Sequence, residues 1–307
     1  MSKPAVWEPV DPGQIREGAL SLAVCPDDPA RPYLLGTLDG LFVWTKSAGG
    51  EWAWKHVPQK GDQGLHVSGQ VRDVLAAESN NCGNGYAATI DRGVWRIAAG
   101  RGTRIDEPGD AIQASRSVIL RDDLLFVGTT EGVRAYDVEQ KKWQPSTVVT
   151  GLVTKQSLSG SRIYAAVWTA GVSFNDSCSD PDKPNNCVWS TPALQPDNKY
   201  VRDVVGSPKG AWIVAGTAGG VFHWDGKIWR QPEGMPTGDI FALAQAEDGR
   251  AVFAAVAGQI WYWNVDDVGL NWSRLGNLSF PVIDLTVAGD YLYATTTNFG
   301  IWRWPLH

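Results

Sequence analysis

Short apolar strands alternate with tight turns along the chain, and one arrangement of the two recurs seven times. In each copy an apolar strand enters a turn whose key residue is usually glycine, and an aromatic-rich strand follows. The copies read GTLDGLFVW, ATIDRGVWRI, GTTEGVRAY, VWTAGVSF, GTAGGVFHW, AVAGQIWYW and TTTNFGIWRW. Their turn residues, spaced by 53, 39, 39, 49, 39 and 41 residues, are Gly40, Gly93, Gly132, Gly171, Gly220, Gln259 and Gly300. A period of about 40 residues in β-type sequence predicts one four-stranded propeller blade per repeat. We therefore expect an all-β, seven-bladed β-propeller that fills residues 1–307 as one domain.

Each repeat divides into four strands, which we name a to d from the centre of the ring outward. In the fifth repeat these strands are expected at 200–206, 212–217, 220–224 and 227–232. The Asp-Gly turn between the last two is a strong hairpin signal. In a propeller the b–c turns and d–a connections share one face, named here the d–a face. The a–b and c–d loops share the opposite face, named the a–b face.

The last repeat has strands a, b and c but no strand d before residue 307. At the other end of the chain, Val6-Trp7-Glu8-Pro9 match the strand d pattern of Trp229-Arg230-Gln231-Pro232. We therefore expect residues 5–10 to supply the fourth strand of the last blade. This pairing would close the ring and cover an edge that otherwise invites aggregation.

Strand c holds much of the tryptophan, of which the chain has 16 residues. Alternate residues of a strand share a face, and here they form the pairs Phe42/Trp44, Phe222/Trp224, Trp261/Trp263 and Trp302/Trp304. An aromatic stripe at one structural position predicts packing between neighbouring blades; the alternative is a set of sugar-stacking platforms. Trp168 and Trp212 lie outside the stripe, which makes them candidates for ligand contact.

All four cysteines fall in expected a–b or c–d loops. Expanded loops are expected at 25–32, 58–70, 79–85 and 175–187. Cys25 and Cys82 occupy equivalent loops of adjacent blades, and Cys178 and Cys187 bracket a short acidic segment. This arrangement favours disulfides and a secreted or periplasmic protein. The alternative is four reduced thiols in a cytosolic protein, which the lack of an apolar leader in MSKPAVWEPV supports.

The net charge and the lengths of the apolar stretches limit the classes of partner that the protein is expected to bind. Lys and Arg number 27 against 33 Asp and Glu, a net charge of −6, which disfavours nucleic acid binding. No apolar run approaches the roughly 20 residues of a membrane span. No C-x-x-C or histidine spacing predicts zinc. Asp176, Asp180 and Asp182 share one loop, but the Gly and Glu of an EF-hand are absent. We expect no cofactor and regard a structural calcium there as the weaker alternative to a solvated acidic turn.

Polar residues recur in the innermost strands. V-R-D-V occurs at 71–74 and 201–204, and V-I-D-L at 282–285, while Ser21, Ser117 and Gln156 are assigned the aspartate position in other blades. Because strand a lines the channel, a polar ring is predicted near its d–a mouth, with polar b–c turns beside it. The predicted ligand-binding residues are Asp39, Arg72, Asp73, Asp91, Arg92, Trp168, Arg202, Asp203 and Asp284. The alternative is that these Asp side chains satisfy backbone N–H groups where strands begin.

The pattern G-T-x-x-G-[LV]-F at 36–42 and 216–222 resembles the repeats of known propellers. It is similar to Asp-box (BNR, sortilin- and sialidase-like) repeats, to photosystem-assembly-factor-like repeats and to sensor propellers of two-component regulators. The resemblance covers nearly the whole chain and implies the fold more than an activity. At 47–52 the Asp-box lacks its central Asp, and the arginine triad, Tyr/Glu pair and acid Asp of sialidases are not placed. Asp225-Gly226-Lys227-Ile228-Trp229 comes closer to the regulator-type D-G-x-x-W.

No G-x-S-x-G, H-E-x-x-H, phosphate-binding glycine loop or heme attachment motif occurs. We therefore favour a non-catalytic binding propeller that presents one face, or the channel mouth, to a protein or small ligand. One alternative is a carbohydrate-binding lectin, although a lectin with a site in each blade would repeat its polar loop residues, and these vary. A second alternative is a glycosidase or lyase with its site at the channel mouth. The oligomeric state and the identity of the ligand are left open.

Overall fold

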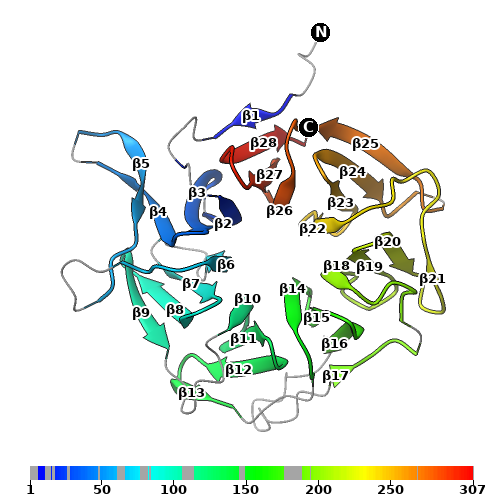
Figure 1. Ribbon diagram of the computed structural model, residues 1–307, viewed down its shortest axis with the longest axis horizontal. Coiled ribbons are helices and arrows are strands. Elements are labelled where there is room, and N and C mark those ends of the chain that lie inside the picture. The colour runs from blue at the N-terminus through cyan, green and yellow to red at the C-terminus, as the bar shows by residue number, and fades with distance from the viewer. Residues whose placement is uncertain are drawn as a thin grey trace.

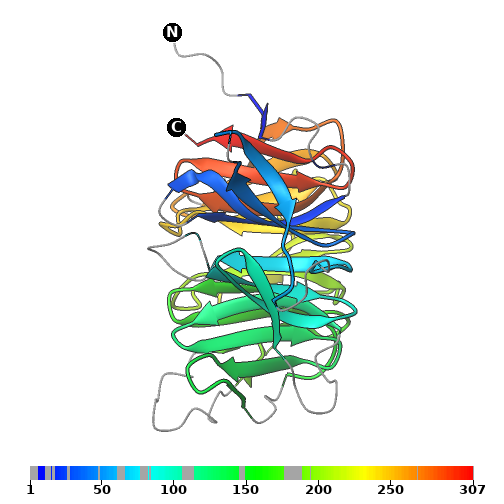
Figure 2. The same cartoon turned by 90° about the vertical axis from the view of Figure 1, so that its left-hand side faces the viewer.

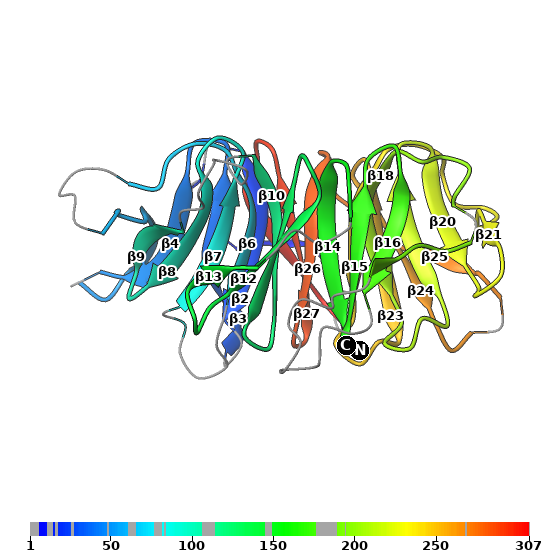
Figure 3. The ribbon, with the colours of Figure 1, turned by 90° about the horizontal axis from the view of Figure 1, so that it is seen from below.

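Seven four-stranded antiparallel sheets stand in a ring, and the innermost strand of each faces a central channel (Figure 1). Edge-on views show the sheets side by side around one axis (Figures 2 and 3). This computed structural model describes residues 6–10, 15, 18–25, 28–47, 49–60, 66–76, 82, 84–105, 114–144, 149–175, 189–193, 195–267 and 269–306. Every element among them is a strand, which confirms the all-β, seven-bladed propeller.

Within each of the first six blades the strands follow chain order from the channel outward. Blades 1 to 3 comprise β2 (Ala19–Cys25), β3 (Asp28–Thr37), β4 (Leu41–Lys46), β5 (Trp52–His56); β6 (Val71–Ala76), β7 (Asn84–Thr89), β8 (Gly93–Ala98), β9 (Arg101–Ile105); β10 (Ser115–Arg121), β11 (Leu124–Thr129), β12 (Val133–Asp137) and β13 (Lys142–Trp143). Blades 4 to 6 comprise β14 (Val153–Ser159), β15 (Arg162–Val167), β16 (Gly171–Asn175), β17 (Trp189–Ser190); β18 (Val201–Gly206), β19 (Ile213–Thr217), β20 (Gly220–Trp224), β21 (Trp229–Arg230); β22 (Ile240–Gln245), β23 (Ala251–Val256), β24 (Gln259–Asn264) and β25 (Trp272–Asn277).

The seventh blade is closed by the N-terminal strand, as predicted. Its order is β26 (Val282–Ala288), β27 (Tyr291–Thr296), β28 (Ile301–Pro305) and then β1 (Glu8–Pro9). Glu8 lies opposite Arg303, with a carboxylate oxygen 3.2 Å from a guanidinium nitrogen. The rings of Trp7 and Trp304 lie 5.6 Å apart. Both ends of the chain therefore meet in one sheet.

The hydrophobic core lies between blades. Buried apolar residues form seven clusters, and each draws its members from one pair of neighbouring blades. Trp95 of blade 2 packs with Leu34 of blade 1, and Phe42 of blade 1 packs with Tyr293 of blade 7. The aromatic stripe of strand c is thus inter-blade packing. Trp212 is partly buried and joins this packing, with its ring centre 5.5 Å from that of Trp263.

Threonine and glycine build the b–c turns. In five blades strand b ends in a Thr whose Oγ1 donates to the turn glycine carbonyl at 2.8–3.0 Å and accepts a turn N–H: Thr37, Thr89, Thr129, Thr217 and Thr296. All six turn glycines have positive φ, a conformation that costs L residues energy. In blade 6, Gln259 lies opposite Val256 as Gly220 lies opposite Thr217, and Ala257 takes the positive φ instead.

One expanded loop is smaller than expected. The first a–b connection was predicted at 25–32, but β3 begins at Asp28, which lies opposite Cys25 in the sheet. Most of this segment is therefore strand. Residues 61–65, 77–81, 83 and 176–188, which hold much of the other predicted expansions, lie outside the described residues.

Candidate functional site

Every innermost strand contains the same irregularity near its start. The register shifts between the first and third residues, so the second residue has no partner in strand b. Such bulges bend a strand and redirect its side chain. The second residues form what we name the bulge ring: Leu20, Arg72, Arg116, Thr154, Arg202, Phe241 and Ile283. The third residues form the inner ring: Ser21, Asp73, Ser117, Lys155, Asp203, Ala242 and Asp284.

Lys155 ties three blades together across the channel. Its Nζ lies 2.9 Å from Asp73 Oδ1 and 3.2 Å from Asp284 Oδ1. These residues belong to blades 4, 2 and 7, none of which are neighbours, so the ion pairs span the centre. The sequence pattern predicts Gln156 at this position and does not single out Lys155. The register corrects this, because Lys155 lies opposite Ala166 as Asp73 lies opposite Ala88.

The buried aspartates also bind backbone N–H groups of the following blade. Asp73 Oδ2 accepts the Val118 N–H at 2.9 Å. Asp203 accepts hydrogen bonds from the backbone N–H groups of Leu243 and of the adjacent residue Val204, both at 2.7 Å. These contacts match the structural alternative, in which the carboxylates satisfy strand backbone. The bonds from Val118 and Leu243 each link a blade to the next, whereas the bond from Val204 lies within one strand.

Burial and crowding shift the acidity of this cluster. Burial raises the pKa of Asp203 to about 7 and that of Asp284 to about 6, although the Lys155 ammonium opposes both shifts. Burial alone would lower the pKa of Lys155, but the attraction of Asp284, Asp73 and Asp203 outweighs it and raises that pKa. One ammonium thus pairs with two carboxyl groups and attracts a third, and the pKa values of Asp203 and Asp284 lie near neutral pH.

Four residues of the inner ring, named here the Lys155 cluster, line a cavity of about 440 Å³: Asp73, Lys155, Asp203 and Asp284. Besides the Lys155 cluster, its lining includes residues toward the a–b ends of the innermost strands: Ser157, Leu158, Gln245, Glu247, Thr286 and Ala288. The cavity therefore extends from the cluster toward the a–b face, and the cluster separates it from the bulge ring.

On the d–a side of the cluster, Arg202 is held by three groups. Its Nε and Nη2 donate to the two carboxylate oxygens of Asp239, both at 3.0 Å. Its guanidinium carbon also lies 4.8 Å from the Trp168 ring centre and 4.4 Å from that of Phe241. Trp168 in turn lies 5.0 Å from Tyr200. The predicted residues Trp168 and Arg202 are thus brought together, with Tyr200 and Phe241, which the sequence analysis did not select.

Arg72 and Arg116 occupy the same ring in blades 2 and 3. Within the described part of the chain neither guanidinium forms a hydrogen bond or ion pair, and the Nε of each is buried without a partner. Burial lowers the pKa of both, and the charge of Arg116 lowers that of Arg72 further. Arg116 was not selected from the sequence because its strand reads S-R-S-V, without the aspartate that marked the other two.

The predicted turn residues lie further out on the d–a face. Asp39 and Asp91 are exposed, and Arg92 Nε lies 3.9 Å from Asp91 Oδ2. Asp91 also packs against Gly69 of a d–a connection, where a side chain at Gly69 would meet its carboxylate. The nine predicted residues therefore divide into two groups. Arg72, Asp73, Trp168, Arg202, Asp203 and Asp284 lie along the channel and its mouth, and Asp39, Asp91 and Arg92 lie on the surface around the mouth.

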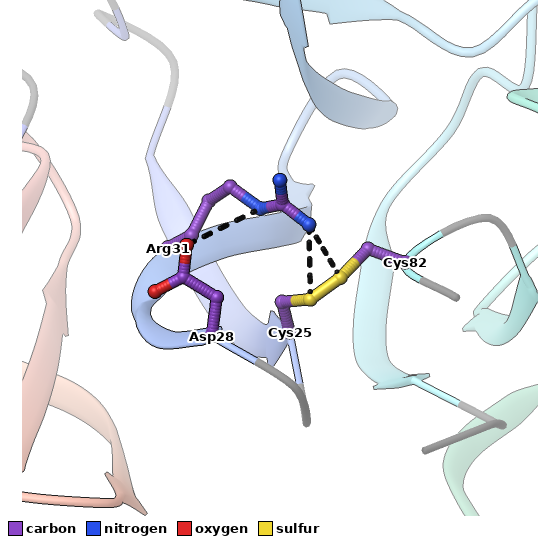
Figure 4. Close-up of a disulfide and its surroundings, with 4 residues drawn as sticks. All are labelled: Cys25, Asp28, Arg31 and Cys82. Carbon is purple, nitrogen blue, oxygen red and sulfur yellow. Dashed lines mark hydrogen bonds and ion pairs between the residues drawn. A yellow bond between two sulfur atoms is a disulfide. The ribbon is translucent and has the colours of Figure 1, made fainter. Parts of the chain in front are cut away.

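On the a–b face a disulfide joins Cys25 of blade 1 to Cys82 beside blade 2, with Cα atoms 5.4 Å apart (Figure 4). Arg31 lies over it, its Nη2 3.1 Å from the Cys25 sulfur and 2.7 Å from that of Cys82. Arg31 also lies 4.0 Å from Asp28. This bond confirms the predicted link between adjacent blades and is compatible with an oxidising compartment.

Cys178 and Cys187, together with the weak calcium candidates Asp176, Asp180 and Asp182, lie outside the described residues. Among the residues that are described, no cluster of three or more His, Cys, Asp or Glu has a metal-binding arrangement. The same residues include no helix with the length and apolar character needed to cross a membrane.

Comparison with known proteins defines the fold class. No protein family model and no curated protein matches the sequence. Among solved structures, the RRP9 WD40 repeats are similar over 98% of this chain and 97% of theirs (TM-score 0.73, 13% identity), and U3-55K over 98% of both (0.71, 14%). The extracellular domain of BT4673 from B. thetaiotaomicron, described as a one-component or hybrid two-component system, matches 97% of this chain (TM-score 0.69, 13% identity). This chain spans 39% of the length of that domain structure. At these identities the likeness shows the seven-bladed β-propeller fold.

Proposed function

We propose that this protein is a non-catalytic binding propeller whose d–a face takes a protein partner. The observation that carries the proposal is where large apolar side chains are exposed. Of the eight exposed large apolar side chains in the described chain, four lie on the d–a face, with 40–56% of their surface accessible: Leu38, Tyr200, Phe241 and Phe299. Exposed apolar groups gathered near one opening mark interaction surfaces.

The d–a face has the composition of an interface. Tyr200, Trp168, Phe241 and Arg202 contact one another in a chain around one side of the mouth. In blade 7, the next blade of the ring after that of Phe241, Phe299 stacks on Phe280 with ring centres 4.3 Å apart. Aromatic residues and arginine dominate binding energy in protein interfaces. The partner we propose presents apolar side chains to these two patches.

The channel cluster supports a binding role over a catalytic one. Lys155, Asp73 and Asp203 are engaged in ion pairs and backbone hydrogen bonds that join blades. Their contacts therefore serve the ring itself. The resemblance to regulator sensor propellers, together with the Cys25–Cys82 disulfide and the extracellular BT4673 neighbour, supports a secreted, periplasmic or cell-surface setting.

A carbohydrate ligand is the second candidate. An open groove of about 680 Å³ lies between blades 4 and 5 on the d–a side, and its lining includes Tyr200, Trp229, Asn198 and Gln231. Aromatic rings beside amide groups suit a sugar, which has apolar ring faces and polar edges.

Photo-crosslinking tests the protein-binding proposal. We would place a benzoylphenylalanine at Phe241 and, as a matched control, at Ile228, which is equally exposed but lies in a c–d turn. A partner crosslinked at Phe241, not at Ile228, and lost from Y200A, supports the proposal. Equal labelling at the two positions would contradict it. Glycan binding abolished by W229A, without protein crosslinking, would favour the lectin.

A further inference from the structure

Two arginines of the bulge ring are left without a counter-charge. Arg72 and Arg116 occupy equivalent positions on β6 and β10, the innermost strands of neighbouring blades. The strands are held side by side by the bond from the Val118 N–H to Asp73, one residue from Arg72 and two from Arg116. Their Nε atoms are buried and unpartnered. A buried charged donor without an acceptor is costly, so this pair requires an explanation.

The molecule itself shows what the position does when a carboxylate is present. Arg202, the third arginine of the bulge ring, pairs through two hydrogen bonds with Asp239, the residue directly before β22. The residue directly before β10, equivalent to Asp239 for Arg72, is Ala114. The residue directly before β14, equivalent for Arg116, is Leu152. Neither can accept a side-chain hydrogen bond.

We infer that Arg72 and Arg116 together bind a carboxylate of a ligand that enters the d–a mouth, in the role that Asp239 has for Arg202. A planar carboxylate matches the fork of a guanidinium, and charge-assisted pairs of this kind are strong. Two adjacent cations that repel each other are stabilised by a shared anion. The site lies on the face used in the proposed function and rests on it for the ligand's identity, but binding of the carboxylate itself is separable.

Calorimetric titration with succinate at constant ionic strength tests the site, with chloride as the reference anion. Succinate binds the unmodified protein, and the R72Q/R116Q variant binds it about tenfold or more weakly, because two charge-assisted contacts are lost. Equal affinity of the two proteins overturns the inference. Binding of sulfate or phosphate with no binding of succinate overturns the assignment to carboxylates.

A substitution that fills the site provides a matched control. A114D supplies Arg72 with the internal carboxylate that Arg202 has and abolishes succinate binding, whereas A114N, of the same shape without the charge, retains it. Loss in both variants, or in neither, counts against the site. Three acids in the segment before Ala114, namely Asp106, Glu107 and Asp110, lie outside the described residues. If succinate binds only after these three are changed to amides, the inference of an external ligand is overturned in favour of the chain's own acids.

Two further measurements complete the test. The first asks whether the carboxylate belongs to a protein partner or to a small molecule, and the second distinguishes this inference from the proposed function. A blocked Leu-Glu-Phe peptide that binds more tightly than succinate, and more tightly than its Gln analogue, identifies a side chain of a protein partner. Succinate as the tighter ligand identifies a small molecule. The variant Y200A/F241A, which lacks the apolar patch, still binds succinate. Crosslinking at Phe241 without succinate binding leaves the proposed function standing and overturns this inference. Succinate binding without crosslinking supports this inference and contradicts the proposed function.

Discussion

At the scale of single residues, the channel is governed by one ammonium group among buried carboxylates. Lys155 contacts Asp73 and Asp284 directly, and Asp203 lies close enough to raise the pKa of Lys155. A buried ion pair contributes little net stability, because desolvation offsets the attraction. Removing one partner is different, since it leaves the other charge buried alone.

Replacing Lys155 with Met is therefore expected to destabilise the protein by about 3–5 kcal/mol at pH 8. The loss should shrink at pH 5, where the orphaned carboxyl groups of Asp203 and Asp284 take up protons. Urea unfolding at both pH values measures the change. Lys227→Met, at an exposed turn position, is the control and should change little. An equal loss at both pH values would argue against the carboxylates as the cause.

The raised pKa of Asp203 predicts a pH dependence of definite sign. Its pKa is about 7 in the folded chain against an ordinary 3.8, so folding takes up a proton between these values. Its contribution to stability therefore rises as the pH falls from 7 toward 4. Asp203→Asn cannot ionise and lacks this contribution.

The difference in unfolding free energy between wild type and D203N should accordingly move in favour of wild type from pH 8 to pH 5. Burial lowers the pKa of His223 to about 4, so the contribution of His223 to stability falls as the pH falls, opposite to that of Asp203. Both proteins contain His223, so the difference between them isolates the contribution of Asp203. A difference that stays constant over this range would contradict the shift.

At the scale of elements, neighbouring blades approach closely at the glycine before the strand b threonine. A Cβ at Gly128 would meet the Ser117 hydroxyl of its own blade and would lie 2.7 Å from Val153 Cγ1 of the next blade. Gly36 and Gly216 face Val71 and Ile240 in the same way. The G-T pair in the repeats thus has two structural causes: the glycine admits the next blade, and the threonine closes the turn.

Gly128→Ala should destabilise the protein by about 1–3 kcal/mol through overpacking. Thermal or urea unfolding measures the loss. The double variant G128A/V153A should recover part of it, because the shorter side chain makes room for the new methyl group. If V153A adds its own cost with no recovery, the clash is not at this contact.

At the scale of the whole molecule, the ring is closed by segments from the two ends of the chain. Strand β1 covers the outer edge of β28, and Trp7 packs on Trp304. The disulfide adds a covalent link between blades 1 and 2, on the a–b face. Closure leaves no long exposed edge in blade 7 where another chain could pair.

Deleting residues 1–10 should lower the melting temperature by about 10 °C. The deletion removes the packing of Trp7, which contributes roughly 3–5 kcal/mol, and each kcal/mol lost lowers the melting temperature by about 2–4 °C. Scanning calorimetry measures the shift. Glu8→Gln, which removes only the half-exposed pair with Arg303, should change it by about 1 °C. A truncated protein that melts like the full chain would refute the closure.

The sequence determined much of this fold because the decisive contacts repeat locally. A strand–turn–strand unit of period about 40 is encoded within each repeat, so blade number, the strand c aromatic packing, the N-terminal closure and the Cys25–Cys82 link followed from pattern. Where a repeat departs from the pattern, as at Lys155, aligning the repeats by residue type places the wrong residue, Gln156, at the inner-ring position.

Tertiary structure alone decided what the channel residues do. Lys155 meets Asp73 and Asp284 across 82 and 129 residues of sequence, and no local period relates such positions. It also decided which bulge-ring arginine is paired: Arg202 meets Asp239 in the next blade, while Arg72 and Arg116 meet no acid among the described residues. Local propensity fixes the strands and turns, whereas charges held by different blades become partners only when the ring brings them to one axis.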